Sequence, residues 1–284
     1  MKIGLECIPC FVRQTFEAVS FITNDERQKE SILRQVLSTL ANESFDRAPP
    51  YIGRVIHEII RDLSGNSDPY LHIKKDSNVL ARRLMPSLRH IMKSSTEPFE
   101  TAVRLAIAGN IIDYGQGDHI SKEKIKETVT SCLDQPINRV TINELRGEIE
   151  KASSILYLGD NAGEVFFDRL LIEKMERYPV TFVVRGAPII NDALRDDARM
   201  AGIDSLVKVV DNGSDVPGTI LEECSKEFQR QFMEADLVIA KGQGNYETLN
   251  DERKKIFFLL KAKCPVIARD IGCDEGDIVI VKNN

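Results

Sequence analysis

Two patterns of hydrophobic residues divide the chain. In the first half, apolar positions recur every three or four residues, the spacing that lets a helix bury one face. This pattern predicts helices over residues 11–22, 26–41, 51–63, 78–93 and 98–112. Clusters of Asn, Asp, Gly, Ser and Pro separate these segments, as expected for loops. No good strand candidate appears before residue 137, so the first half is predicted to be helical.

After residue 153 the apolar residues instead form short continuous runs. These predict strands over residues 155–158, 180–184, 206–210, 237–240 and 265–268, with helices over 165–177, 192–201, 218–234 and 250–262. Continuous hydrophobicity indicates strands buried on both faces, which is typical of a mainly parallel sheet covered by helices. Residues 278–281 are a candidate antiparallel edge strand. We therefore expect an α/β fold: an all-α bundle (residues 1–95), then a three-layer α/β/α Rossmann-like domain (residues 96–284).

Composition narrows the class of protein. The 284 residues carry a net charge of −6, which disfavours binding to a nucleic acid polymer or to an anionic membrane. No apolar stretch approaches the roughly 20 residues that span a bilayer. Glu6 and Arg13 interrupt any signal-peptide core, so we expect a cytoplasmic protein. The six scattered cysteines do not resemble a disulfide framework, and the Cys7/Cys10 pair leaves structural, metal-binding and redox roles open.

Polar residues follow every predicted strand. In open α/β sheets, ligands bind beyond the carboxyl ends of the strands, so these residues are expected to share one edge. The segments are Gly159–Glu164, Arg185–Pro188 with Asn191 and Asp192, Asp211–Gly213, Lys241–Asn245, and Arg269 with Asp270.

The residue types at this edge suit a phosphate site with a divalent metal. Asp160, Asn161 and Asp192 are hard oxygen donors, which favour Mg²⁺ or Mn²⁺ over zinc. Lys241 and Arg185 supply positive charge, and the turn from Gly242 to Gly244 can expose backbone amides to an anion. Together these groups point to metal-assisted phosphoryl chemistry.

Simpler explanations exist for single residues. Asn161 and Glu164 have the spacing of a helix capping box, and Asn191 or Asp192 can cap or favour the next helix start. The Gly242–Gly244 segment resembles part of a dinucleotide fingerprint, but the third glycine is missing. Residues 211–213 fit an ordinary turn.

The helix predicted over residues 98–112 has an unusual continuation. Its apolar stripe leads to Asn110 and Asp113, which stand three residues apart and therefore on one side. Polar groups on a core-facing stripe need partners, which are either neighbouring backbone groups or the predicted site at the sheet edge.

Five ordered blocks of sequence resemble the metal-dependent damage-control phosphatases, also called the ARMT-like family. The blocks are Cys7–Cys10, Ala108–Asp113, Gly159–Glu164, Arg185–Asp192 and Ala240–Glu247. They span nearly the whole chain, and the CxxC pair is similar to that of the stand-alone prokaryotic and archaeal branch.

The resemblance implies an all-α bundle on an α/β/α domain and a phosphatase for small phosphorylated metabolites. It implies a divalent cation (Mg²⁺, Mn²⁺, Co²⁺ or Ni²⁺) on Asp160, Asn161 and Asp192, and a phosphate contact from Lys241. Asn110 and Asp113 match polar positions near the site, and we assign Asp113 a general-base or supporting role. Arg185 and Asn245, with Gly242 and Gly244, are expected to contact substrate.

Two other functions are compatible with the sequence. One is methyl transfer from S-adenosylmethionine to carboxylates, which has been attributed to a eukaryotic branch of the family; the absence of a glycine-rich loop after the first strand argues against it. The other is binding of a nucleotide or sugar phosphate without catalysis. The substrate, the metal, the general base and the oligomeric state are not predicted.

Overall fold

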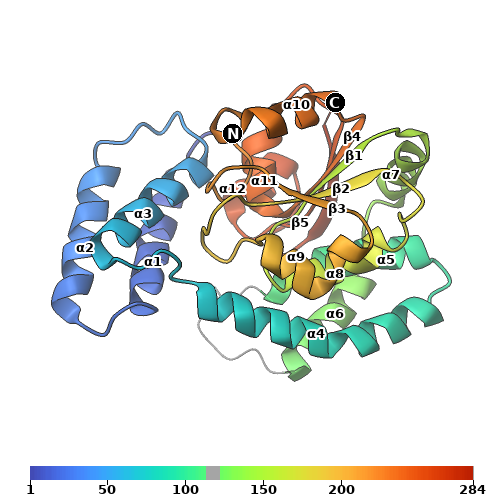
Figure 1. Cartoon of the computed structure of the whole chain (residues 1–284), viewed down its shortest axis with the longest axis horizontal. Helices are drawn as coiled ribbons and strands as arrows, with labels where there is room; N and C mark the ends of the chain where they lie inside the picture. Colours follow the sequence, from blue (N-terminus) through green and yellow to red (C-terminus); the bar gives the residue numbers. More distant parts are fainter. Residues whose placement is uncertain (113–121, 284) are drawn as a thin grey trace.

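The computed structural model describes residues 1–112 and 122–283, which form a helical bundle attached to an α/β/α sandwich (Figure 1). The bundle contains α1 (Cys7–Ser20), α2 (Glu26–Leu40) and α3 (Pro49–Ser64). Local signals set its helix ends: Asp25 caps α2 by accepting from the Arg27 amide, and Gly65 ends α3 in the left-handed conformation. The buried faces of the three helices form one apolar core.

Six strands form one sheet in the order β3-β2-β1-β4-β5-β6. The strands are β1 (Ile155–Leu158), β2 (Val180–Val184), β3 (Lys208–Asp211), β4 (Leu237–Lys241), β5 (Ile256–Lys261) and β6 (Ile278–Lys282). All neighbours pair in parallel except β5 and β6, which are antiparallel. The α/β class, the mainly parallel sheet and the helical first half are therefore confirmed.

Helices cover both faces of the sheet, because alternate strand residues point to opposite cores. One face packs against α4 (Leu71–Ser94), α5 (Pro98–Ala108), α6 (Lys122–Asp134), α7 (Arg139–Lys151), α8 (Glu164–Ile172) and α9 (Arg195–Ala201). The other packs against α10 (Lys226–Glu234), α11 (Gly242–Leu249) and α12 (Pro265–Ile271). Three 3₁₀ segments complete the described elements: η1 (Gly109–Ile112), η3 (Ile203–Ser205) and η4 (Leu221–Glu223).

Helix α4 lies along the sandwich, although its residues precede the predicted domain boundary at residue 95. Ala81, Leu88 and Met92 of α4 belong to the core beneath the sheet, and α4 contacts α8 and α9. Figure 1 shows α4 running beneath α8 and α9, and Ile73 in its first turn belongs to the core of the α1–α3 bundle. Helix α4 therefore joins the two units, because its first turn packs in the bundle core and its later turns pack on the sandwich.

Two predicted elements near the C-terminus are wrong. The second half of the expected helix over 250–262 is β5, and the expected strand over 265–268 lies in α12. Every residue from Ile256 to Leu260 is buried, because β5 lies inside the sheet between β4 and β6. Pro265 occupies the first turn of α12, where a missing amide hydrogen costs nothing. Helices α6, α7 and α11 were not predicted.

The six cysteines form no disulfide in the structure. Cys7 begins α1 and Cys10 follows on its next turn. Burial raises the pKa of both thiols, and the neighbouring Glu247 carboxylate adds to the shift. Within the described ranges, no helix combines the length and apolar character of a membrane span.

Candidate active site

The predicted site residues meet at the point where the sheet order reverses. Strands β1 and β4 are neighbours, but the chain continues from β1 toward β2 on one side and from β4 toward β5 on the other. Their carboxyl ends therefore border a crevice, the usual ligand position in such sheets. Asp160 follows β1, and Gly242 follows β4. A Cβ atom on Gly242, which has φ +78°, would lie 1.8 Å from Asp160 Oδ2, so only glycine fits between this carboxylate and the start of α11.

Asp160, Asn161 and Asp192 lie on two segments that are joined by backbone hydrogen bonds. An isolated antiparallel bridge pairs Asn161 with Asp192, and the Ala193 amide donates to the Asp160 carbonyl at 2.8 Å. All three side chains are nearly buried, with exposed fractions of 8%, 7% and 4%. The structure thus brings together the three residues predicted to hold a metal.

Asn110 completes this group from the first half of the chain. It lies on η1, which continues α5, and its Nδ2 donates to Asp160 Oδ2 at 3.1 Å and to Glu164 Oε2 at 3.0 Å. Among the described residues, the side chain of Asn110 is therefore partnered by residues of the predicted site at the sheet edge and not by neighbouring backbone groups. Asp113, the other member, lies outside the described residues.

The capping explanations for Asn161 and Glu164 are wrong. The N-cap of α8 is Gly163, with no side-chain cap, and its amide donates to Asn78 Oδ1 of α4 at 2.8 Å. The Asn161 amide group donates instead to Asp160 Oδ2 at 2.9 Å and to Glu164 Oε2 at 3.3 Å. Both side chains are thus turned into the carboxylate cluster.

Lys241 lies beneath this cluster rather than at an open surface. Its ammonium group is fully buried and donates to the Ala106 carbonyl and to Asp168 Oδ1, each at 2.7 Å, and to Glu164 Oε1. Asp168 also accepts from Tyr157 Oη at 2.7 Å. These bonds occupy all three ammonium hydrogens. The structure therefore differs from the expectation that Lys241 points at a phosphate.

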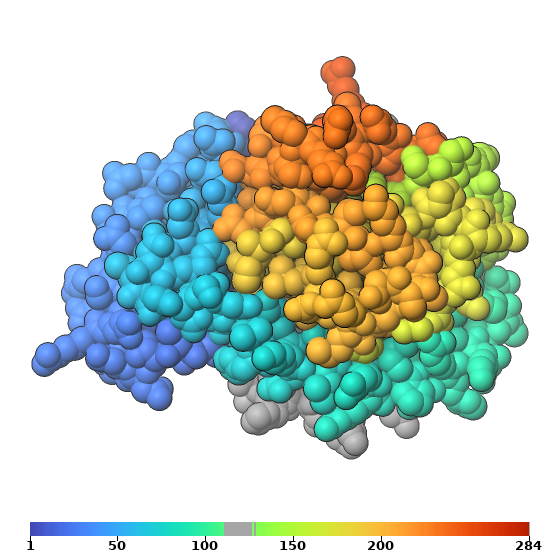
Figure 2. Space-filling model, viewed as in Figure 1, coloured from blue at the N-terminus to red at the C-terminus, as the bar shows by residue number. Residues whose placement is uncertain are grey.

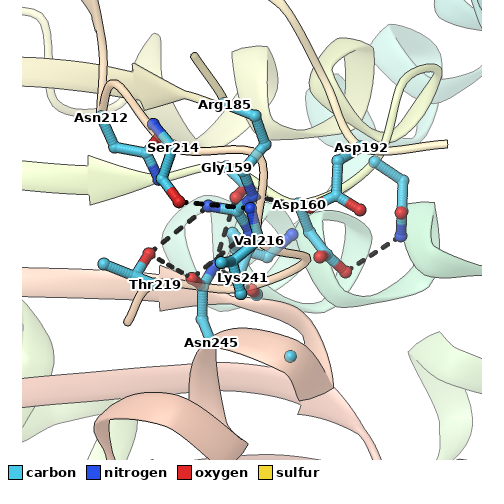
Figure 3. A network of polar contacts seen from close by, with 12 residues as sticks. Gly159, Asp160, Arg185, Asp192, Asn212, Ser214, Val216, Thr219, Lys241 and Asn245 are labelled. Atoms are coloured by element: carbon cyan, nitrogen blue, oxygen red, sulfur yellow. Dashed lines mark hydrogen bonds and ion pairs between the residues drawn. The ribbon is translucent and has the colours of Figure 1, made fainter. Parts of the chain in front are cut away.

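Arg185 and Asn245 are also internal supports (Figure 3). Arg185, 1% exposed, donates from Nε to Asp192 Oδ2 at 2.6 Å and reaches Asn245 Oδ1 at 3.4 Å. Asn245 also accepts from Thr219 Oγ1 at 2.8 Å, and it donates to the Lys241 carbonyl at 2.7 Å. These contacts tie together the ends of β1, β2 and β4.

Gly244 fits a close contact between two segments. A Cβ atom at this position would lie 2.7 Å from the Pro217 carbonyl oxygen. Its small size therefore allows α11 to pack against the segment that follows β3.

Negative charge exceeds positive charge at this edge. Among the described residues of the network, four nearly buried carboxyl groups accompany two buried cations. The groups are Asp160, Glu164, Asp168 and Asp192, with Lys241 and Arg185. Burial and the neighbouring carboxylates raise the pKa of Asp160 well above its usual range. Burial also raises the pKa of Asp168, to about 6, although Lys241 opposes the shift.

This excess charge and the oxygen donors fit a hard divalent cation. Asp160, Asn161 and Asp192 offer carboxylate and amide oxygens, which such cations prefer. Within residues 1–112 and 122–283, no cluster of three or more His, Cys, Asp or Glu side chains has metal-binding geometry. The candidate ligand set therefore depends on two carboxylates together with an amide.

Sequence reasoning missed Asp168, Tyr157 and Asn78. Asp168 carried a usable signal, because it follows Glu164 by one helical turn in the mainly apolar segment EVFFDRLLI. Tyr157 lies inside an apolar strand, and Asn78 lies on a helix remote in sequence, so neither had a local signal.

Comparison with known proteins agrees with this geometry. The damage-control phosphatase ARMT1-like domain matches residues 3–279. A damage-control phosphatase of Pyrococcus horikoshii is 37% identical over 288 residues, covering 100% of this chain and 99% of that protein. One of Archaeoglobus fulgidus is also 37% identical, covering 98% of each chain.

A solved structure extends the agreement to the fold. The crystal structure of a DUF89 family protein from Pyrococcus horikoshii superimposes with a TM-score of 0.91 at 36% identity, covering 100% of both chains. An uncharacterized protein of Methanocaldococcus jannaschii is 39% identical over 293 residues, covering 99% of this chain and 96% of that protein. The chain therefore belongs to the damage-control phosphatase ARMT1-like family.

Proposed function

We propose that this protein is a metal-dependent phosphatase that hydrolyses phosphomonoesters of small metabolites. The observation that carries the proposal is the excess of buried carboxyl groups over cations at the crevice between β1 and β4. Such an excess is costly without a compensating cation. The names of the relatives from Pyrococcus horikoshii and Archaeoglobus fulgidus support a phosphatase. Sugar phosphates, nucleotides and damaged phosphorylated metabolites are the expected substrates, and the cytoplasm is the expected location.

Asp160, Asn161 and Asp192 would hold the cation, which we take to be Mg²⁺, Mn²⁺, Co²⁺ or Ni²⁺. Such a cation, when bound, polarises a phosphoryl oxygen and makes a bound water more acidic. Because these ligands are nearly buried, their charge acts through a medium of low polarity, where electrostatic interactions are strong.

The remaining side chains orient these ligands. Arg185 pairs with Asp192 at 2.6 Å, and Asn110 fixes the Asp160 carboxylate. Lys241 forms ion pairs with both Glu164 and Asp168, so we propose that it acts mainly through them as a positioning residue. The α11 amides from Gly242 onward begin beside Asp160 and are the best-placed anion donors. Asp113 stays a predicted general base or supporting residue.

The decisive experiment is phosphate release from para-nitrophenyl phosphate and from a panel of sugar phosphates and nucleotides. The protein is first treated with chelator, and Mg²⁺, Mn²⁺, Co²⁺ and Ni²⁺ are then restored singly. Asp160→Ala is compared with Asp211→Ala, a matched carboxylate at the end of β3 that pairs with Arg195.

We expect release that needs a metal, disappears in Asp160→Ala and persists in Asp211→Ala. Absence of release with every metal and substrate would refute the phosphatase. Binding of a nucleotide or sugar phosphate without turnover would then support the non-catalytic alternative, and methyl transfer to a carboxylate would support the methyltransferase.

A further inference from the structure

The loop that carries Asp192 contains a strained residue. Ile190 has φ +42°, and it is the only non-glycine residue with positive φ in the described part of the chain. A β-branched side chain is poorly tolerated in this region of backbone space. Such a conformation persists only where the surroundings impose it. Ile190 precedes Asp192 by two residues.

The bundle supplies the surroundings that impose it. The Ile190 side chain packs against the apolar core of α1–α3, the core that also contains Ile52, Ile56 and Ile60 of α3. Ile190 thus belongs to a loop of the α/β sandwich, but its side chain packs against the helical bundle. In Figure 2 the blue bundle meets the yellow and orange segments of the sandwich along a continuous seam.

A second contact from the bundle holds the same loop. Arg61 of α3 donates from Nη1 to the Pro188 carbonyl at 3.2 Å and from Nη2 to Asp215 Oδ2 at 2.7 Å. Arg54, two turns earlier on α3, pairs with Asp215 Oδ1 at 3.1 Å. The bundle therefore holds the backbone after β2 and a side chain after β3.

The far end of the loop is fixed to β1. The Ala162 amide donates to the Asn191 carbonyl at 2.9 Å, and the bridge between Asn161 and Asp192 follows directly. Ile190 lies between this fixed end and the segment held by Arg61. Its backbone conformation therefore sets how the chain enters Asp192.

We propose that Ile190 and Arg61 are positioning residues through which the helical bundle holds Asp192 beside Asp160. The inference rests on the proposed function, because it assigns the bundle a role in forming the metal site. In this arrangement the bundle is a structural part of the site, although its helices supply none of the predicted metal ligands.

The test uses Ile190→Ala, which removes the seated side chain, and Ile190→Leu, which keeps an apolar side chain of the same size. Ile56→Ala is the matched control, because it removes the same atoms from the bundle core at a helical position. Arg61→Met is compared with Arg34→Met, whose exposed ion pair with Glu30 lies within α2.

Two quantities are measured for each full-length variant, well below its unfolding temperature. The first is hydrogen–deuterium exchange of the segment from Arg185 to Ala193, which needs neither metal nor substrate. The second is Mn²⁺ affinity by calorimetry, with kcat and KM for para-nitrophenyl phosphate beside it.

We expect faster exchange of this segment in Ile190→Ala and Arg61→Met, and about 10–100-fold weaker Mn²⁺ binding, the range for lost supporting contacts around a metal. Ile190→Leu should restore most of the affinity. Ile56→Ala should lower thermal stability without either effect. Unchanged exchange in Ile190→Ala, or equal acceleration in Ile56→Ala, overturns the proposal. If the wild-type protein binds no metal, the proposed function fails, while the exchange data still decide whether the bundle positions the loop.

Discussion

Replacing Lys241 by methionine removes the buried cation under the site while keeping a similar unbranched chain. Lys241 has no exposed surface, and it donates to Glu164, Asp168 and the Ala106 carbonyl. Its loss leaves two carboxylates without their shared partner, and breaking a buried pair in this way costs about 3–5 kcal/mol. For a chain of this size, with about 2 °C per kcal/mol, the melting temperature should fall by roughly 6–10 °C.

The assay is thermal and urea unfolding at pH 7, monitored by circular dichroism, which gives the melting temperature and the free energy of unfolding. Lys151→Met is the control, because its ion pair with Glu148 is exposed and should be worth less than about 1 kcal/mol. Adding Glu164→Gln and Asp168→Asn to Lys241→Met should recover part of the loss, since neutral side chains need no counter-charge. A loss below about 1 kcal/mol in Lys241→Met alone would refute the idea that this lysine stabilises both carboxylates.

Three further predictions concern a close contact, a partly buried carboxyl group and a buried histidine. Gly242→Ala forces a Cβ atom into the Asp160 carboxylate. Mn²⁺ binding measured by calorimetry should therefore be lost, while the far-UV circular dichroism spectrum is retained. Unchanged Mn²⁺ affinity would contradict this contact. Burial raises the pKa of Glu247 to about 7, so its ionisation destabilises the fold as pH rises from about 4.5 through 7. Glu247→Gln should therefore gain stability over the wild type in this window, by up to about 3 kcal/mol above pH 7, and equal pH profiles would exclude the shift. Burial lowers the pKa of His57 to about 3, and its Nε2 has no hydrogen-bond partner. The wild type should thus lose stability as pH falls from about 6.5 toward 3, and His57→Phe should remove that loss in acid-unfolding curves.

The sequence was sufficient for elements whose patterns are local. Strands β1 and β2 were predicted with their observed bounds, because a continuous apolar run between turn residues has few alternatives. The run from Ile256 to Leu260 was equally apolar, but it was merged with the preceding polar residues and assigned to a helix. Burial by β4 and β6 on either side decides its conformation, and that information is not local.

The part of the site that follows the ends of the strands could be predicted from the sequence. The parallel-sheet rule brought Asp160, Asn161 and Asp192 to one edge before any distances were known. It could not show that Lys241 turns inward. The local sequence around a lysine that follows a strand does not show whether its side chain lies in solvent or beside two buried carboxylates. Glu164 and Asp168 come close to Lys241 only when α8 packs on the sheet.

The order of the strands also determines when the site can form. Strand β1 lies between β2 and β4, yet β4 follows it by almost 80 residues of chain. During synthesis Asp160 leaves the ribosome long before Gly242, so its carboxylate stays hydrated until α11 is made. A complete binding site then exists only in the finished native state, so a ligand that needs it stabilises that state alone. Such a ligand should slow unfolding while leaving the rate of folding nearly unchanged.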